Sequence, residues 1–314
     1  MNKTKNSETK DTQAFGSCAK PFVKWVGGKG QLLSSIEKSL PHNISGIPDL
    51  TYIEPFVGGG AMLFWILANF TTIKRAVIND INPDLTNAYR TVRDHVHELI
   101  ARLKNMQQDY QSLQTEDNRR EFYLSVRKRF NTKSLENTEN AALFIFLNRT
   151  CFNGLYRVNS KGLFNVPFGK NVHPTICDEK TLLADSALLQ KVEILTGDFE
   201  QTLDYASRNT FFYFDPPYKP LNRTSNFTSY TKEEFDDREQ IRLKQFCDAI
   251  SSKGYLWILS NSDVKSGDSD NNFFDELYAS YRIERVWASR SVNSNPEKRG
   301  KLTELLIHSQ FIKR

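Results

Sequence analysis

Cysteine and histidine are scarce in this chain of 314 residues, which contains four of the former and five of the latter. The four cysteines are scattered along the chain, without the close spacing of a metal site or a disulfide framework: Cys18, Cys151, Cys177 and Cys247. The sequence therefore predicts reduced thiols and no bound metal.

Long hydrophobic runs are also missing. No stretch reaches the length of a membrane span, and the polar segment Met1–Thr12 lacks the apolar region of a secretory signal peptide. Residues 1–19 are rich in polar side chains, which predicts a disordered tail. We therefore expect a cytoplasmic protein with no membrane partner, whose 39% hydrophobic content suffices for a globular core.

Positive charge, in contrast, is concentrated at the carboxyl end of a chain with a net charge of +5. A second basic cluster is Arg127–Arg129. From charge alone, a polyanionic partner such as DNA and a solvated basic surface are equally good accounts. Between Tyr281 and Arg314 three acids (Glu284, Glu297 and Glu304) stand against eight basic residues: Arg282, Arg285, Arg290, Lys298, Arg299, Lys301, Lys313 and Arg314.

The segment Phe211–Tyr218 has the sequence Phe-Phe-Tyr-Phe-Asp-Pro-Pro-Tyr. Four consecutive aromatic residues predict a strand of a sheet that is covered on both faces. The strand must end at Asp215, because neither of the two prolines that follow can donate a hydrogen bond to a ladder. In open α/β sheets the carboxyl ends of the strands are where ligands bind.

An exocyclic amino group fits this tetrapeptide. Asp215 and the carbonyl of Pro216 can each accept one of its hydrogens, which directs the nitrogen lone pair towards an electrophile. Tyr218 offers an aromatic face on which a flat heterocycle can stack. The alternative is a proline turn capped by the aspartate. We favour the chemical interpretation, because the full tetrapeptide after an aromatic strand is uncommon for a turn.

Two glycine-rich turns precede this segment. Pro21–Leu33 predicts a short strand, a glycine turn and a helix, where Lys29 either meets a carboxylate or is a surface lysine. Thr51–Glu54 predicts a strand, which is followed by a glycine loop (55–60) and the apolar helix Ala61–Phe70. Strand, glycine loop and helix together are typical of half of a nucleotide-binding unit.

The next strand, Arg75–Asn79, ends at Asp80, 20 residues beyond Gly60. An acid at this position typically bonds the hydroxyls of a ribose. The alternative for Asp80 is a helix cap before Pro83. Beyond it, apolar spacing predicts helices over Asp84–Leu113, around 119–130 and 141–148, and then a β-hairpin around the turn 160–162.

In their order and residues these motifs resemble those of the Dam-type DNA N6-adenine methyltransferases, the α group and D12 class whose products carry methyladenine in GATC. Asp-Pro-Pro-Tyr (215–218) matches their amino-methyltransferase signature, and Lys-Trp-Val-Gly-Gly-Lys (24–29) matches their amino-terminal cofactor motif. The segment 148–169 matches their target-recognition hairpin almost without gaps. The resemblance covers about residues 20–310.

The resemblance implies S-adenosylmethionine as cofactor and direct methyl transfer to adenine N6 in double-stranded DNA, with no metal. The catalytic residues would be Asp215, Pro216 and Tyr218. The segment Asn222–Tyr230 is expected to be a lid that orders on DNA. The cofactor would be held by Trp25, Lys29, Glu54, Phe56, Gly58, Gly60, Asp80, Asp198, Phe199 and Asp215.

The same resemblance gives roles to residues of the hairpin. Arg157 would contact a guanine, in keeping with the two hydrogen bonds that Arg donates to guanine O6 and N7. Leu155 and Pro167 would contact a thymine methyl group. Phe152 and Asn153 would enter the duplex beside the extruded adenine. Outside the hairpin, Arg127 would contact a phosphate.

The predicted fold is α/β, with a Rossmann-like seven-stranded sheet of the S-adenosylmethionine-dependent methyltransferase type. The catalytic domain is expected over 20–84 and 191–314, and a mainly helical target-recognition domain that carries the β-hairpin over 85–190. A helix (232–252), a strand (255–260) and a basic hairpin (283–311) would complete it. We expect a monomer or weak dimer.

Three alternatives are open at this point. An RNA adenine methyltransferase would share the core but lack the recognition hairpin. A cytosine-N4 methyltransferase more often has serine in place of Asp215, and no cysteine follows a proline as the nucleophile of cytosine-C5 methyltransferases does. A non-catalytic DNA-binding relative would be expected to have lost Lys29, Asp80 or Asp215, and all three are present.

Overall fold

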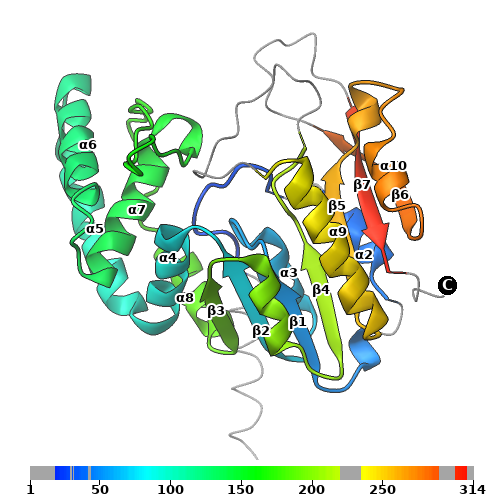
Figure 1. Cartoon of the computed structure of the whole chain (residues 1–314). Coiled ribbons are helices and arrows are strands. Elements are labelled where there is room, and N and C mark those ends of the chain that lie inside the picture. Colours follow the sequence, from blue (N-terminus) through cyan, green and yellow to red (C-terminus); the bar gives the residue numbers. More distant parts are fainter. Residues whose placement is uncertain are drawn as a thin grey trace, which may run out of the picture.

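The computed structural model describes residues 18–28, 30, 32–41, 44–219, 235–289 and 301–309. Its centre is a seven-stranded sheet with helices on both faces (Figure 1). The strands are β1 (Leu50–Glu54), β2 (Ile73–Asp80), β3 (Val192–Thr196), β4 (Thr210–Phe214), β5 (Leu256–Ser262), β6 (Arg282–Ser289) and β7 (Lys301–His308).

The strand order is β3-β2-β1-β4-β5-β7-β6. The first five strands in this order pair in parallel, whereas β7 is antiparallel to both β5 and β6. The order reverses between β1 and β4, so the loops after these two strands diverge and leave room for a ligand at their carboxyl ends. The predicted Rossmann-like sheet of seven mostly parallel strands is confirmed.

Nine α-helices and four 3-10 turns are present in the part of the chain that the structure describes. Helices α5, α6 and α7 lie together beyond the β3 edge of the sheet, with α4 and α8 between them and the strands (Figure 1). The helices are α2 (Leu33–Ser39), α3 (Ala61–Asn69), α4 (Pro83–Asp94), α5 (Val96–Ser112), α6 (Glu116–Phe130), α7 (Asn137–Thr150), α8 (Glu179–Leu189), α9 (Asp237–Ser252) and α10 (Phe273–Leu277), and the turns are η2 (Ile44–Gly46), η3 (Phe152–Gly154), η4 (Phe199–Tyr205) and η5 (Val264–Ser266).

The aromatic strand β4 separates two hydrophobic cores. Successive side chains of a strand point to opposite faces, so Phe211 and Tyr213 join the core under α2, α3, α4 and α8. Phe212 and Phe214 join the core under α9 and α10. All five residues of β4 are buried, as predicted from the unbroken apolar run.

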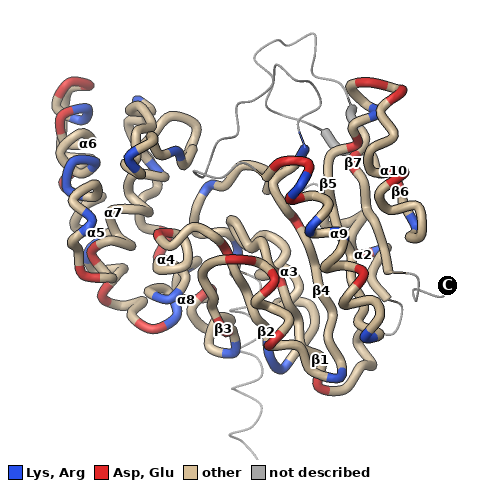
Figure 2. The backbone as a smooth tube through the Cα atoms, viewed as in Figure 1, with Lys and Arg blue, Asp and Glu red and all other residues tan. Residues whose placement is uncertain are grey.

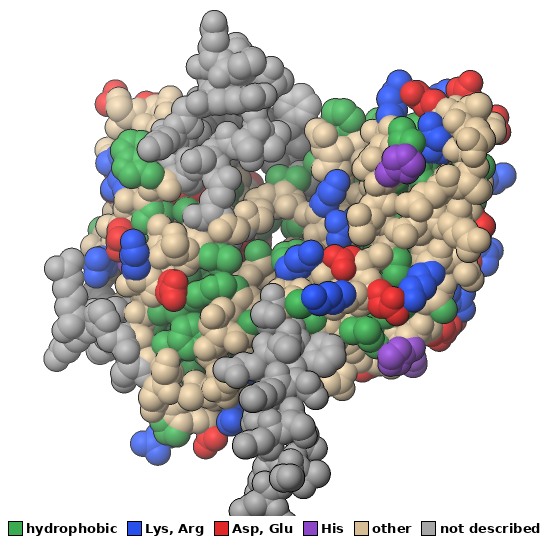
Figure 3. Space-filling view, turned by 180° about the vertical axis from the view of Figure 1, so that it is seen from behind, with side chains coloured by type: hydrophobic (Ala, Val, Ile, Leu, Met, Phe, Trp, Pro, Cys, Tyr) green, Lys and Arg blue, Asp and Glu red, His purple; other side chains and the backbone are tan. Residues whose placement is uncertain are grey.

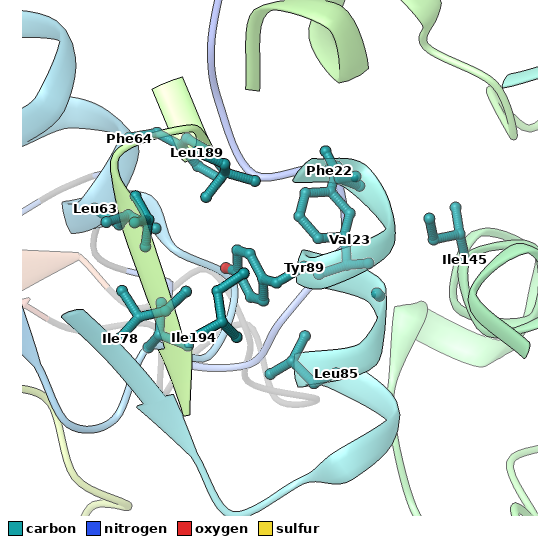
Figure 4. Packing of buried hydrophobic residues seen from close by; sticks show 14 of the residues in the cluster. Phe22, Val23, Leu63, Phe64, Ile78, Leu85, Tyr89, Ile145, Leu189 and Ile194 are labelled. Atoms are coloured by element: carbon teal, nitrogen blue, oxygen red, sulfur yellow. The ribbon is translucent and has the colours of Figure 1, made fainter. Parts of the chain in front are cut away.

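The first core continues from the sheet into the outer helices. Tyr89 on α4 lies at its centre, beside Phe22 and Leu85 (Figure 4), and its ring meets Phe22 edge-on at 5.0 Å between centroids. The same cluster includes buried residues of α5, α6 and α7. The outer helices therefore share a continuous core with the sheet rather than resting on it through a polar contact.

The expected helix over Asp84–Leu113 is interrupted. It forms two helices, because His95 (φ −134°, ψ 34°) leaves the helical conformation between α4 and α5. Helix α4 begins at Pro83, where the Asn82 side chain accepts hydrogen bonds from the backbone N–H groups of Asp84 and Leu85. The break lets α4 pack on β2 and β3 while α5 turns away towards α7.

The short strand expected within Pro21–Leu33 does not form in the residues described there. The segment is held by side chains instead of a strand ladder. The Lys24 N–H donates to Asn148 Oδ1 (2.7 Å), Asn148 Nδ2 donates to the Lys24 carbonyl (2.8 Å), and Arg149 donates to the Phe22 carbonyl (2.7 Å). Its backbone groups are therefore satisfied by α7 and not by an edge of the sheet.

The expected recognition hairpin has antiparallel pairing but no regular strands. The pairing between its two arms is limited to isolated bridges, Cys151 to Phe168 and Val158 to Phe164. The Asn165 N–H also donates to the Arg157 carbonyl across the hairpin (3.0 Å). The 3-10 turn η3, where Asn153 has a positive φ of 54°, interrupts the first arm and prevents a continuous ladder.

Charges of both signs lie along α5 and α6 (Figure 2). On the face opposite to that of Figure 1, lysine and arginine side chains also lie among acidic ones (Figure 3). In the described part of the chain, none of the helices is both long and apolar enough to cross a membrane.

Candidate active site

The carboxyl edge of the parallel strands gathers four acids. Glu54 ends β1, Asp80 ends β2, Asp198 follows β3 and Asp215 follows β4. Adjacent parallel strands bring their carboxyl ends to one edge, so residues spread over 161 positions of sequence lie along the same edge of the sheet. The structure thus places at one edge the four acids that the sequence analysis named as site residues. The environments of the four carboxylates differ.

The glycine loop between β1 and α3 is closely packed by two aromatic side chains. Gly60 (φ 77°) precedes α3, and a Cβ atom there would lie 2.4 Å from the Tyr89 hydroxyl. A Cβ atom on Gly58 (φ 49°) would lie 2.9 Å from Cδ1 of Trp25. Glycine is therefore required at both positions by conformation and by space.

Asp80 holds this loop in place. Its Oδ2 accepts a hydrogen bond from the Gly58 N–H (3.1 Å), and its Oδ1 accepts one from the Asn82 N–H (2.9 Å). Burial raises the pKa of Asp80 to about 6, against the opposing effect of these two hydrogen bonds. The residue as a whole is only partly buried and lies beside the glycine loop.

Glu54 is almost fully buried, with 2% of its surface exposed. Burial raises the pKa of Glu54 well above its usual value; a hydrogen bond from the Tyr52 hydroxyl to Oε2 (2.8 Å) lowers it, and the charge of Asp215 raises it further. A buried carboxylate beside a second acid is costly unless a cation joins it. This end of the site therefore suits a positively charged ligand group.

Asp198 is bound by an arginine that sequence patterns did not indicate. Arg242, on α9, donates to Asp198 Oδ1 (3.0 Å) and Oδ2 (2.6 Å). Its guanidinium also lies over the ring of Phe199, 4.2 Å from the centroid. Hydrogen bonding from Arg242 holds the pKa of the Asp198 carboxyl below its usual value.

Three aromatic rings lie next to this pair. Phe56, after β1, is 5.2 Å from Phe199 and 5.6 Å from Phe235, measured between ring centroids. Phe56 is partly exposed, while only 4% of Phe199 is exposed. The group forms an apolar surface with a carboxylate at its edge, an environment that suits a planar heterocycle.

The tetrapeptide 215–218 is held from two neighbouring elements. On β5, Ser260 Oγ donates to Asp215 Oδ1 (3.1 Å). On α9, the buried Gln240 donates through Nε2 to the Pro217 carbonyl (3.1 Å). Pro216 is itself buried. These contacts fix the carboxylate and the backbone of the tetrapeptide at the end of β4.

Trp25 connects the glycine loop with the hairpin 148–169. Its indole stacks on Tyr156 at 5.8 Å between centroids, with 27° between the ring planes, while it also packs against Gly58 and Gly59. Lys29, expected beside it, and the expected lid over 222–230 lie outside the described residues.

The hairpin presents the side chains that the sequence predicted for DNA. Phe152 is 52% exposed, Asn153 and Pro167 are exposed, and Leu155 is partly buried. Arg157 is exposed, and its Nε donates to Asn165 Oδ1 (2.7 Å), so the guanidinium is held from one side.

Basic residues of the two positively charged segments are partly engaged within the protein. Arg127 donates to the Val166 carbonyl (3.2 Å) and lies over the Tyr123 ring. Arg285 is paired with Asp263 (3.0 Å) and Asp275 (2.8 Å). Acids distant in sequence therefore offset part of the positive charge counted at the carboxyl end.

Among the described residues, no group of three or more histidine, cysteine or carboxylate side chains is arranged to hold a metal ion. The groups that the structure gathers at this edge of the sheet are carboxylates, aromatic rings and backbone groups. With their strand order, these features define a methyltransferase of Rossmann-like fold.

Comparisons with known proteins place the chain more narrowly. Residues 25–292 match the family model described as D12 class N6 adenine-specific DNA methyltransferase. The chain is 47% identical over 291 residues to the Type II methyltransferase M.MjaIII of Methanocaldococcus jannaschii, an alignment that covers 92% of this chain and 98% of that protein. It is 37% identical over 289 residues to the DNA adenine methylase of Haemophilus influenzae, covering 91% and 92%. The chain belongs to the D12 class of N6 adenine-specific DNA methyltransferases.

Proposed function

We propose that this adenine-specific DNA methyltransferase transfers a methyl group from S-adenosylmethionine to N6 of the adenine in GATC within double-stranded DNA. The observation that carries the proposal is the position of the Asp215–Tyr218 tetrapeptide at the reversal of strand order, beside the glycine loop. An amino-group site and a nucleotide-type site are thereby adjacent.

The chain has groups that fit each part of S-adenosylmethionine. Asp80 would accept hydrogen bonds from the ribose hydroxyls, and the buried Glu54 would be matched by the amino group of the methionine end. Asp198, with its carboxylate already oriented by Arg242, would accept a hydrogen bond from the adenine amino group. Phe56 and Phe199 would contact the adenine ring. Trp25, Gly58, Gly60 and Lys29 would complete the site, as the resemblance implies.

When bound, the cofactor supplies a methyl group on a sulfonium, which is a good leaving group. Asp215 would accept one hydrogen of the target amino group, and the Pro216 carbonyl would accept the other. This pair keeps the nitrogen lone pair directed at the methyl carbon. Because Ser260 already holds Asp215, little reorganisation is needed when the base arrives.

We propose that residues 85–190 contain the DNA-recognition unit. The target adenine must leave the stack, which costs a few kcal/mol. The exposed Phe152 and Asn153 would fill the gap and Arg157 would donate to a guanine edge, while Leu155 and Pro167 would contact a thymine methyl group. Arg127 would add a phosphate contact with its remaining donors.

The sequence preference can be tested with duplexes that contain GATC or each of its single-base variants, at one fixed salt concentration. We expect kcat/KM to be highest for GATC. Arg157→Ala should remove about ten- to a hundredfold of discrimination at one guanine position, since a bidentate pair contributes about 1–3 kcal/mol. Arg120→Ala, an exposed arginine on α6, is the matched control and should keep the wild-type preference.

Three outcomes would contradict parts of the proposal. If Arg157→Ala slows all sites equally, then Arg157 contacts a phosphate and not a base. A wild-type enzyme that prefers a different sequence would refute the GATC assignment. Asp215→Ala with near-normal turnover would show that the tetrapeptide has only a structural role.

A further inference from the structure

The hydroxyl of Tyr218 is anchored by a strand that forms no other part of the site described above. It donates a hydrogen bond of 2.7 Å to Oε2 of Glu304 on β7, 86 residues further along the chain. Glu304 is buried, with 9% of its surface exposed. This acid follows the tetrapeptide by more than a quarter of the chain and belongs to none of the motifs in the sequence.

The backbone of Glu304 is fixed on both sides. It pairs with Ser262 of β5 and with Val286 of β6 in antiparallel ladders. Its neighbour Ser262 also donates through Oγ to the Lys219 carbonyl, directly after the tetrapeptide (2.7 Å). The acceptor for the Tyr218 hydroxyl is therefore carried by a strand that is paired on both sides.

An anchor at the hydroxyl restricts the ring more than packing alone. The tyrosine side chain has only two torsions, and fixing its far end to a rigid strand removes most of the remaining tilt of the ring. Burial, together with the charges of Asp215 and Glu304, holds the pKa of Tyr218 well above its usual value. The phenol therefore keeps its proton and remains a donor to Glu304 at neutral pH.

We propose that Glu304 is a positioning residue for methyl transfer: by accepting the Tyr218 hydrogen bond, it sets the ring plane on which the target base stacks. The inference rests on the proposed function. Glu304 itself would not touch the base or the cofactor. Its contribution would appear in the rate at saturating substrate and not in the binding of DNA.

The test compares Glu304→Ala, Glu304→Gln and Tyr218→Phe with the wild type and with the double variant Tyr218→Phe/Glu304→Ala. We expect Glu304→Ala to lower kcat about ten- to a hundredfold, as small misplacements of reacting groups do. The dissociation constant for GATC duplex should change less than threefold. Glu304→Gln should restore most of the rate, since its amide oxygen can also accept the hydrogen bond.

The double variant supplies the sharper criterion. If both side chains act through one hydrogen bond, the double variant should be no slower than the slower single variant. A duplex with 2-aminopurine at the target position adds a readout independent of turnover. Stacking on Tyr218 should quench the fluorescence of 2-aminopurine in the wild type and in Glu304→Gln, but less in Glu304→Ala. Glu284→Ala on the neighbouring strand β6 is the control for damage to the hairpin and should keep the wild-type kcat.

The inference would be overturned, with the proposed function left intact, by a wild-type kcat for Glu304→Ala or by rate losses that multiply in the double variant. Equal loss of rate in Glu304→Gln and Glu304→Ala would also overturn it. Absence of methyl transfer by the wild type to any adenine-containing duplex would refute the proposed function, and the inference with it.

Discussion

At the residue scale, the carboxylates at the ends of the strands differ in their pKa values because their neighbours differ. Glu54 is buried beside a tyrosine hydroxyl and a second acid, which favours its neutral form. Asp198 is bonded to an arginine, which favours its ionised form. Asp80 lies between these extremes, because burial is partly offset by two backbone N–H donors. Protonation of Asp80 therefore falls within an accessible pH range.

This leads to a prediction for cofactor binding. The free protein has an Asp80 pKa of about 6, and a ligand that donates to the carboxylate prefers the ionised form and lowers that pKa. The affinity for S-adenosylmethionine should therefore rise with pH up to about 6 and change little above it. Below that value we expect a loss of at most about tenfold per pH unit.

Titration calorimetry between pH 5 and pH 7 would measure this dependence. Asp80→Asn should bind more weakly and should lose the part of the pH dependence that belongs to Asp80. Asp94→Asn, an acid paired with Arg93 at the end of α4, should behave as the wild type. An identical pH profile for the wild type and Asp80→Asn would show that Asp80 does not meet the ligand.

At the scale of elements, the amino-terminal end of α4 connects the carboxyl edge of the parallel strands to the hairpin 148–169, the proposed sites of the cofactor and of DNA. Asp80 accepts from the N–H of Asn82, which caps α4. Asp84, in the first turn, accepts from the Tyr156 hydroxyl (2.8 Å) and from Lys133 Nζ (3.1 Å). Tyr156 in turn stacks on Trp25 beside the glycine loop.

We expect this connection to couple the two ligands. The substitution Tyr156→Phe keeps the stacked ring but removes the hydrogen bond between the hairpin and Asp84 of α4. In the wild type, S-adenosylhomocysteine should increase the affinity for GATC duplex. In Tyr156→Phe that increase should be smaller by roughly fivefold, which is within the usual range of coupling between sites. Fluorescence anisotropy with and without S-adenosylhomocysteine would measure the coupling.

Tyr110→Phe is the matched control for this comparison. It removes a buried hydroxyl that donates to the Asn171 carbonyl (2.6 Å) in the same helical region, away from Asp84. The two variants should lose similar stability, about 1 kcal/mol for one hydrogen bond. Equal coupling in Tyr156→Phe and the wild type would mean that this connection does not transmit cofactor binding.

Local sequence patterns predicted the elements of the site well. Four consecutive aromatic residues before Asp215 and two prolines predicted β4 and its end, and a glycine loop before an apolar helix predicted the start of α3. The supporting residues could not be predicted in this way. Arg242 is 44 residues from Asp198, Ser260 is 45 from Asp215, and Tyr156 is 72 from Asp84.

Such contacts depend on how helices and strands pack, which no local pattern records. For the same reason, the net charge of the basic carboxyl-terminal segment did not predict how its arginines are paired. Counting charges predicted a positive surface there, but Arg285 meets Asp263 and Asp275, which the fold brings from other elements. The strand expected near Phe22 was wrong for a related reason, because α7 satisfies that backbone with side chains of Asn148 and Arg149.

At the scale of the whole molecule, a buried acid links the amino-terminal segment to the first core. Asp185 on α8 is fully buried, and its Oδ1 accepts from the Lys20 N–H (3.1 Å). Its Oδ2 has no hydrogen-bond partner among the residues that the structure describes. Burial raises the pKa of Asp185 to about 8, so the folded protein binds a proton that the unfolded chain releases near pH 4.

The sign of the effect on stability follows from this difference. Between pH 4 and pH 8 the folded state holds more protons than the unfolded state, so the contribution of Asp185 to stability is full at low pH and is lost as pH rises. The loss is on the order of 5 kcal/mol as an upper limit.

We expect the Tm of the wild type to fall between pH 6 and pH 9. The Tm of Asp185→Asn should fall less, and this variant should melt several degrees higher than the wild type at pH 9. Asp178→Asn, at the amino-terminal cap of the same helix but partly exposed and paired with Lys20 (3.2 Å), should not gain stability at pH 9. If Asp185→Asn melts below the wild type at every pH, then Asp185 is ionised in the folded protein and holds the amino-terminal segment as a charge.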